Sequence, residues 1–373
     1  MPDVFFYGTL CHVPLLEIVL GRRVEPQDLA GAILADYAVF GVVGQPFPLI
    51  WATPGGSISG VLASGLTRDD LARLEFYEGG YSYDLRPLTV QQGTNGAVQA
   101  QVFMPPAGIW QVGAPWSLDR WVDEWAPQSE QAAVEVMAHF GRLSPQDVAR
   151  RFPGIRIRAA AWVAAQARAG DPDRDLSRDV VVHAHHRRYS NFFAAEEMDL
   201  QYRRYDGSLS PVLNRGAQIL GQAAIVLPYD PRLDSVLIVE QFRAPLLMGG
   251  DRAPWLWQPV AGLVDPGETP QQAAHREAME EAGLTLTRLE PVAGVYSSPG
   301  ANSDYLNLFV GLSDFTTRQE GGGLADEGED IRVDIISFSD LMQGVDQRRY
   351  RDMQLTTTAL WLARHRDRLR EAG

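Results

Sequence analysis

The sequence predicts a two-domain chain, with a small α+β barrel followed by a mixed sheet between helices. Its 373 residues are too many for one ordinary core. A polar segment rich in chain breakers, residues 170–177, separates two differently patterned halves. We therefore expect one domain over residues 1–115, a helical connector and linker over 116–177, and a second domain over 178–373.

The first half has a strand pattern that gives way to a helical one. Between residues 4 and 106, short apolar strands such as 38–43 and 98–103 are broken by Gly and Pro, and one helix is expected over 67–77. From residue 116 to 169 helix signals dominate, with Ser144 as N-cap before Pro145 and an interruption at Pro153.

The second half alternates strands with helices. Strands are expected at 200–205 and 208–213, joined by Asp206-Gly207, a pair that favours a type I′ hairpin turn. Further strands are expected at 222–228, 235–241, 306–312 and 331–338, and an amphipathic helix at 356–368.

Composition narrows the classes of function. The formal charge is −14, and the 33 basic residues, all arginine, are scattered, which speaks against nucleic-acid binding. The single Cys11 permits no internal disulfide. The N-terminus lacks a signal-peptide pattern, and no apolar run approaches the roughly 20 residues that span a bilayer. We expect a cytoplasmic protein with no membrane partner.

The most informative segment is a loop and helix over residues 262–284. Thr269 is the expected N-cap, Pro270 the first helical residue, and Gln272 the partner in a capping box. Gly283 is expected to end the helix in a left-handed turn.

Three carboxylates share one face of this helix. Glu277, Glu280 and Glu281 are three and four positions apart, so they lie together and repel one another. A cation between them would relieve this repulsion, and all-oxygen ligands suit Mg²⁺ or Mn²⁺. The alternative is a solvated acidic face.

The segment resembles the Nudix box, Gly-x5-Glu-x7-Arg-Glu-U-x-Glu-Glu-x-Gly-U with U apolar, at every fixed position. The flanking sequence resembles the ADP-ribose pyrophosphatase branch of that family over residues 180–362. The resemblance implies an α/β/α sandwich and Mg²⁺-dependent hydrolysis of ADP-ribose to AMP and ribose 5-phosphate by a homodimer formed through this domain.

The same resemblance implies roles for individual residues. Glu277, Glu281, the carbonyl of Ala261 and Glu329 would bind the metal, with Glu280 beside them. Glu327 would be the catalytic base, with Glu329 as the alternative. Substrate contacts would come from Arg215, Arg243, Phe192 or Phe193, Ser298, Gly300 and Asp304.

Three positions depart from that branch, which more often has Glu at Asp304, Glu at Gln258 and an acid at Gly216. The alternatives left open are hydrolysis of another nucleoside diphosphate sugar such as GDP-mannose, and binding of ADP-ribose without turnover.

The N-terminus contains a second candidate site. A strand runs into the turn Tyr7-Gly8-Thr9-Leu10, whose N–H groups would hold a carboxylate. This turn and the segment Tyr77-Glu78-Gly79 resemble the γ-glutamylcyclotransferase-like family, which implies a barrel-like fold and proton transfer by Glu78 during release of 5-oxoproline. The pairing of the two domains resembles bacterial fusions named for tellurite resistance. A regulatory Nudix domain beside an active cyclotransferase is the third alternative.

Overall fold

The computed structural model describes residues 2–80, 83–93, 96–319, 322–323 and 330–371. The chain forms two compact units. Unit 1 comprises Met1–Asp175 and Tyr189–Phe192, and unit 2 comprises Leu176–Arg188 and Phe193–Gly373.

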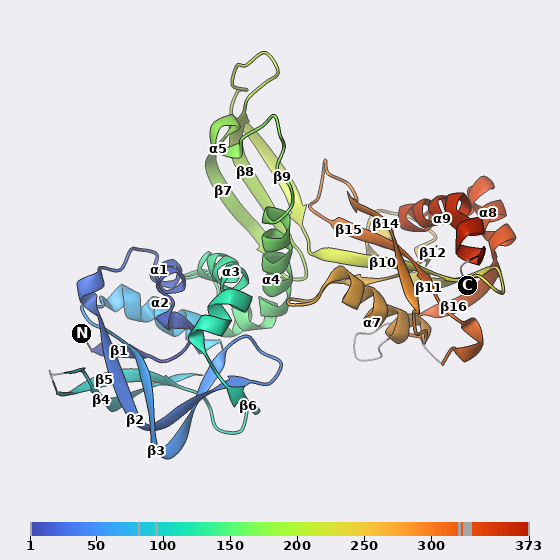
Figure 1. The fold of residues 1–373 in the computed structure, drawn as a ribbon. Helices are drawn as coiled ribbons and strands as arrows, with labels where there is room; N and C mark the ends of the chain where they lie inside the picture. Colours follow the sequence, from blue (N-terminus) through green and yellow to red (C-terminus); the bar gives the residue numbers. More distant parts are fainter. Residues whose placement is uncertain (1, 81–82, 94–95, 320–321, 324–329, 372–373) are drawn as a thin grey trace. The chain divides into compact units, whose positions relative to one another are not determined.

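Unit 1 is a β-barrel with helices packed on it (Figure 1). The strands follow the order β3-β1-β5-β4-β2, and a further pairing of β2 with β3 closes the ring, with β6 beside β2. The strands are β1 (Asp3–Phe6), β2 (Leu29–Val42), β3 (Pro48–Ala63), β4 (Asp84–Gln91), β5 (Ala97–Met104) and β6 (Val112–Pro115). β1 pairs with β5 in parallel, and β2 pairs with β3 antiparallel from Leu29–Ala63 to Gly41–Pro48.

The helices of unit 1 share one apolar core with one side of this barrel. They are α1 (Val13–Leu20), α2 (Arg68–Gly79), α3 (Leu118–Met137) and α4 (Pro145–Gln166), with short 3-10 turns at η1 (Thr9–Cys11) and η2 (Pro26–Asp28). Buried Leu16, Leu74, Trp121 and Ile155 come from all four helices. The helical segment after the barrel therefore packs as part of unit 1.

Two expectations for local structure were wrong. Helix α4 runs through Pro153 without a break, because a proline removes one helical hydrogen bond while packing of Ile155 and Ala159 holds the following turns. The Asp206-Gly207 turn is not type I′, since φ is positive at Gly207 but not at Asp206. The second strand of that hairpin starts only at Leu213, so most of 208–213 is loop.

Unit 2 contains a mixed sheet in the order β12-β11-β10-β15-β14, with β13 paired to β10 and β16 to β11, and a separate sheet β7-β8-β9. β10 and β15 are parallel from Gln222–Tyr305 to Tyr229–Leu312, and the other pairs of the large sheet are antiparallel. The strands are β7 (Val180–Ser190), β8 (Ala194–Tyr202), β9 (Leu213–Ile219), β10 (Gln222–Asp230), β11 (Ser235–Phe242), β12 (Trp255–Gln258), β13 (Val260–Leu263), β14 (Arg288–Tyr296), β15 (Tyr305–Leu312) and β16 (Arg332–Ser337).

Helices cover both faces of the large sheet, which gives the expected α/β/α sandwich (Figure 1). Along β10, Val226 packs toward α7 while Leu227 packs toward the two C-terminal helices, as the alternation of a strand requires. The helices are α5 (Leu176–Asp179), α6 (Ala244–Met248), α7 (Pro270–Ala282), α8 (Phe338–Asp346) and α9 (Met353–Glu371), with a 3-10 turn η4 (Phe315–Thr317).

Among the described residues, no helix is long and apolar enough to cross a bilayer.

Candidate functional sites

Helix α7 begins and ends as its sequence predicts. The Thr269 N–H donates to Gln272 Oε1 at 2.8 Å, and the Gln272 N–H donates to Thr269 Oγ1 at 3.2 Å, which completes the capping box. Gly283 has φ 64° and closes the last turn. Fully buried alanines line the face of α7 that meets the sheet: Ala273, Ala274, Ala278 and Ala282. Because these side chains are small, the helix can lie close to the strands.

Two of the three clustered carboxylates lie against neighbouring residues of β13, Ala261 and Gly262. Glu281 is 2% exposed, and its Oε2 accepts the Ala261 N–H at 3.1 Å. The Glu277 carboxylate lies over Gly262, where a Cβ would be 1.8 Å from Glu277 Oε1. The absence of a side chain at Gly262 therefore provides the space that the Glu277 carboxylate occupies.

Arg276 links the remaining acids of this segment. Its guanidinium donates to both Glu268 oxygens at 3.1 and 2.9 Å, to Glu277 at 2.6 Å and to Glu280 at 3.1 Å. It also donates to the Leu263 carbonyl at 2.9 Å. The Glu268 hydrogen bond and the neighbouring Glu277 raise the pKa of Arg276 above its usual value. This guanidinium supplies part of the positive charge that the clustered carboxylates need, so their repulsion alone does not require a metal.

The donor chemistry of this segment fits a hard divalent cation. Carboxylates of Glu277 and Glu281, together with a backbone carbonyl at Ala261, are oxygen ligands of the kind that Mg²⁺ and Mn²⁺ prefer. The space at Gly262 allows the Glu277 carboxylate to lie against β13, the strand that contains Ala261. Among the described residues, no group of three or more His, Cys, Asp or Glu side chains is arranged to hold a metal ion. The proposed ligand Glu329 and the proposed base Glu327 lie outside the described residues.

The expected substrate residues fall into separate places. The loop before β15 is joined to β9, since the Gln218 N–H donates to the Ala301 carbonyl and the Ser303 N–H to the Gln218 carbonyl, both at 3.0 Å. Gly300 of this loop lines a shallow pocket with Gly216 and Gln218. Arg215, the neighbour of Gly216 on β9, is exposed. The structure thus brings Gly300 alongside the strand that contains Arg215.

The other loop residues are held by backbone contacts. The Ser298 carbonyl accepts the Ala301 N–H at 2.9 Å, and the Asp304 carbonyl accepts the Ser297 N–H at 3.0 Å. Burial raises the pKa of the Asp304 carboxyl.

Arg243 follows β11 and is held by a buried polar chain. Its Nε donates to Gln258 Oε1 at 2.6 Å, and Gln258 Nε2 donates to Asp352 Oδ2 at 2.8 Å. Gln258, one of the departures from the branch, is therefore hydrogen-bonded both to Arg243 and to Asp352, the residue directly before α9. Phe192 is 70% exposed and belongs to unit 1, whereas Phe193 is half-buried and belongs to unit 2.

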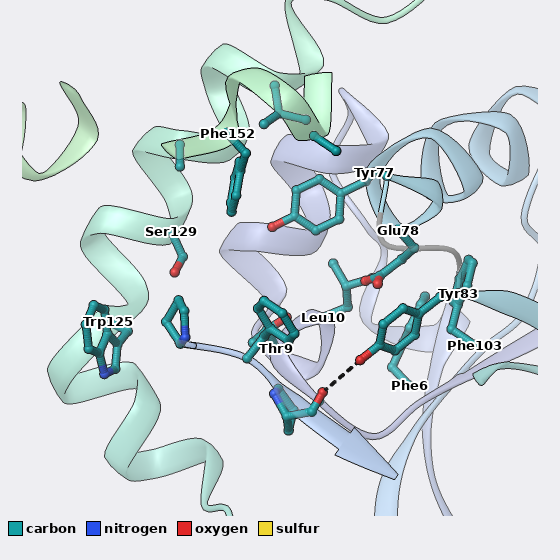
Figure 2. Close-up of a pocket in the computed structure, with 18 of the residues that line it drawn as sticks. Phe6, Thr9, Leu10, Tyr77, Glu78, Tyr83, Phe103, Trp125, Ser129 and Phe152 are labelled. Carbon is teal, nitrogen blue, oxygen red and sulfur yellow. Dashed lines mark hydrogen bonds between the residues drawn. The ribbon is translucent and has the colours of Figure 1, made fainter. Parts of the chain in front are cut away.

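The N-terminal turn and Glu78 line one cavity of about 110 Å³ in unit 1 (Figure 2). Tyr7, Gly8, Thr9 and Leu10 all contribute to its wall. The Tyr7 hydroxyl donates to the Phe103 carbonyl at 2.8 Å, which ties the turn to β5. A Cβ at Gly8 would be 2.8 Å from Pro48 Cγ, so this close approach requires glycine.

Burial controls the charge state of this cavity. It raises the pKa of Glu78 to about 7, because desolvation disfavours the charged carboxylate there. Burial and then the nearby Glu78 charge raise the pKa values of Tyr77 and Tyr83. A carboxyl that titrates near neutral pH can both accept and return a proton.

Sequence reasoning missed several residues of both sites. Gln241 Nε2 donates to Glu281 Oε1 at 3.5 Å. Gly262 was a fixed position of the expected box, but the space that it leaves for the Glu277 carboxylate was not foreseen. In unit 1, Trp125 and Ser129 of α3 and Phe152 of α4 line the cavity. The spacing of Trp121, Trp125 and Ser129 by four residues, which places all three on one helical face, was a usable signal.

Comparison with known proteins identifies both units. Residues 220–354 match the family described as NUDIX domain, and residues 4–122 match the family described as Gamma-glutamyl cyclotransferase, AIG2-like. The chain is 35% identical over 192 residues to the ADP-ribose pyrophosphatase of Escherichia coli strain K12, covering 52% of this chain and 91% of that protein. The chain belongs to the NUDIX family, with an AIG2-like γ-glutamylcyclotransferase domain fused before the Nudix domain.

Of two further relatives, one carries the same name and the other a different one. An ADP-ribose pyrophosphatase of Haemophilus influenzae is 35% identical over 43% of this chain and 74% of its own length. A GDP-mannose pyrophosphatase of Cronobacter sakazakii is 32% identical over 43% of this chain and 83% of its own length. This chain is a Nudix hydrolase, an enzyme that acts on pyrophosphate bonds.

Proposed function

We propose that unit 2 hydrolyses the diphosphate bond of ADP-ribose to AMP and ribose 5-phosphate. The observation that carries this proposal is the placement of Glu277 and Glu281 against Ala261 and Gly262 of β13. Relatives named ADP-ribose pyrophosphatase, which this chain covers over 91% of their length, support the choice of substrate.

Glu277, Glu281 and the Ala261 carbonyl would hold Mg²⁺, or Mn²⁺ in its place, with Glu280 beside them. The metal, when bound, neutralises diphosphate oxygens and lowers the pKa of an attacking water. Arg276 keeps the carboxylates of Glu277 and Glu280 in place through its hydrogen bonds. Glu327 would align or deprotonate the water, with Glu329 as further ligand or alternative base.

Several residues of the chain would contact the substrate. Gly300 and its loop would contact the sugar side beside β9, together with Ser298 and Asp304. Arg215 and Arg243 would hold the diphosphate, with Phe192 or Phe193 stacking on the base across a homodimer. The hydrogen bond between Arg243 and Gln258 would have to be shared or exchanged when a phosphate binds.

A panel of ADP-ribose, GDP-mannose and NADH tests this choice. The full chain should release AMP from ADP-ribose in the presence of Mg²⁺, with kcat/KM at least tenfold above that for the other two. GDP-mannose is the main alternative substrate, because a GDP-mannose pyrophosphatase is 32% identical to this chain. A preference for GDP-mannose would replace the substrate and keep the mechanism. Binding of ADP-ribose without any phosphate-bond cleavage would instead indicate a nucleotide sensor.

We propose γ-glutamyl cyclotransfer as a second function, located in the unit 1 cavity. The supporting observation is Glu78, a carboxyl with a pKa of about 7, in one cavity with the Tyr7–Leu10 turn. The turn would hold the substrate α-carboxylate. The α-amine then forms a bond to the γ-carbonyl carbon while the γ-amide C–N bond breaks.

Glu78 takes the proton of the attacking amine and gives it to the leaving amine, so 5-oxoproline and a free amine form without consumption of water. Release of 5-oxoproline from γ-glutamyl peptides, lost on Glu78→Gln, is the test. Release that persists in this variant would exclude Glu78 as the proton carrier.

A further inference from the structure

The cavity of unit 1 has a wall that the family match does not include. The match ends at residue 122. Beyond that point the cavity is lined by Trp125, Gln128 and Ser129 of α3 and by Phe152 and Arg156 of α4. The two helices pack onto the barrel helices in one compact unit, so this wall is a fixed part of the cavity.

The reacting end and the helical wall lie on opposite sides of the cavity. In Figure 2, Glu78 and Tyr83 lie on one side, Trp125 and Ser129 on the other, and Tyr77 and Phe152 between them. A γ-glutamyl substrate also has two ends. Its glutamyl end reacts at Glu78, and its amine end must extend away from that carboxyl.

The chemistry of the wall selects among amine ends. Trp125, Phe152 and the neighbouring Tyr77 present aromatic rings, which favour an aromatic or large apolar side chain. Of the described residues that line the cavity, Glu78 and Arg156 are the ones with ionisable or charged side chains besides the tyrosines. Arg156 Nη1 donates to Gln45 Oε1 at 3.5 Å, and its guanidinium is the positive charge among these described lining residues, of the kind that pairs with a carboxylate.

Resting on the cyclotransfer function proposed above, we infer that α3 and α4 form a specificity pocket for γ-glutamyl dipeptides with an aromatic second residue. Trp125 and Phe152 bind the side chain of that residue, and Arg156 binds its free carboxylate. Bulky aromatic dipeptides are thus the substrate class, and small or cationic second residues are disfavoured.

The test compares γ-Glu-Phe, γ-Glu-Ala and γ-Glu-Phe-amide as substrates of the full chain, with 5-oxoproline and the leaving amine measured by chromatography. The expected kcat/KM is at least tenfold higher for γ-Glu-Phe than for either comparison substrate. Phe152→Ala should bring the Phe-to-Ala ratio close to one, and Phe152→Leu should give an intermediate ratio. Arg156→Gln should remove the advantage of the free carboxylate over the amide.

Trp162→Ala is the matched control, since Trp162 lies on the same helix, is 48% exposed and does not line the cavity. It should keep the wild-type ratios. Cyclotransfer with equal kcat/KM for γ-Glu-Phe and γ-Glu-Ala would overturn the inference and leave the cyclotransfer proposal intact.

Absence of 5-oxoproline from every substrate would instead overturn the proposed reaction. Calorimetric binding of γ-Glu-Phe and γ-Glu-Ala to the same variants then decides the pocket separately. Tenfold tighter binding of γ-Glu-Phe, lost in Phe152→Ala, supports it, and equal binding refutes it.

Discussion

Gly262→Ala tests whether the position of the Glu277 carboxylate matters for hydrolysis. The added Cβ would lie 1.8 Å from Glu277 Oε1 and 2.0 Å from its Cδ, whereas ordinary contacts begin at 3.4 Å. To reach ordinary contact, Glu277 Oε1 must therefore move by about 1.6 Å, the difference between 3.4 and 1.8 Å. A misplacement of about 1 Å in an active site can cost on the order of 10²-fold in rate. We expect kcat for ADP-ribose to fall by at least that factor, which corresponds to about 3 kcal/mol in the activation barrier.

The same change should have little effect on folding. Gly262 does not have positive φ, so alanine fits its backbone, and the displaced group is the end of a flexible side chain. Alanine also reduces the freedom of the unfolded chain, worth about 0.4–1 kcal/mol. The free energy of unfolding should thus stay within about 1 kcal/mol of wild type.

The assay is AMP release at saturating ADP-ribose and Mg²⁺, paired with a urea unfolding curve for each variant. Gly249→Ala is the matched control, because it adds the same methyl group in unit 2 with its nearest neighbour, the Pro245 carbonyl oxygen, at 3.4 Å. It should keep wild-type kcat. Wild-type kcat in Gly262→Ala would refute the placement of Glu277 at the reacting centre, and a large loss of stability would show that the residue serves folding instead.

Three further predictions concern other groups. Glu281→Gln should lower kcat for ADP-ribose more than 10²-fold while ADP-ribose affinity changes less than tenfold, because charge at the metal acts mainly in the transition state. Steady-state kinetics and calorimetry measure the two effects, and an unchanged kcat would remove Glu281 as a metal ligand. The pKa of Glu78 is raised to about 7, so the fraction of its ionised, proton-accepting form falls tenfold per pH unit below 7. We therefore expect kcat/KM for 5-oxoproline release to rise with pH and to level off above about 7. A flat profile from pH 5 to 8 would contradict this. Arg158 is buried and donates to Glu135 at 2.6 and 3.1 Å. Arg158→Met leaves the Glu135 charge buried and unpaired, so it should destabilise unit 1 by about 3–5 kcal/mol, and the double variant with Glu135→Leu should lose clearly less. Equal losses in thermal unfolding would show that the unpaired charge is not the cause.

Local signals in the sequence predicted the parts of the fold that depend on neighbouring residues. Thr269 with Gln272 and Gly283 define the ends of α7 as expected, since capping is a contact within a few positions. The 208–213 strand was misplaced because Asp206-Gly207 indicates a turn but does not fix where pairing resumes. At Pro153 the helix continued because tertiary packing outweighed a local penalty.

The sites depend on contacts between distant positions, which local patterns cannot supply. Nothing near Gly262 in the sequence indicates that its missing side chain makes room for Glu277. In unit 1, the cavity wall comes from α3 and α4, the helices that we interpreted from the sequence as a connector. The charges of the box helix had the same limit. Three adjacent carboxylates suggested an unseen cation, yet Arg276, a neighbour in the sequence, already contacts two of them.

The two sites handle acidic side chains by opposite means. In unit 2, a guanidinium fixed by Glu268 and the Leu263 carbonyl offsets clustered negative charge. Within the described part of unit 1, no guanidinium bonds to Glu78, and burial shifts its pKa toward neutrality instead. A positioned cation suits a site that must hold anionic diphosphate, because it limits repulsion before substrate arrives. An acid made weaker by burial suits proton exchange near pH 7, since neither of its forms is strongly favoured.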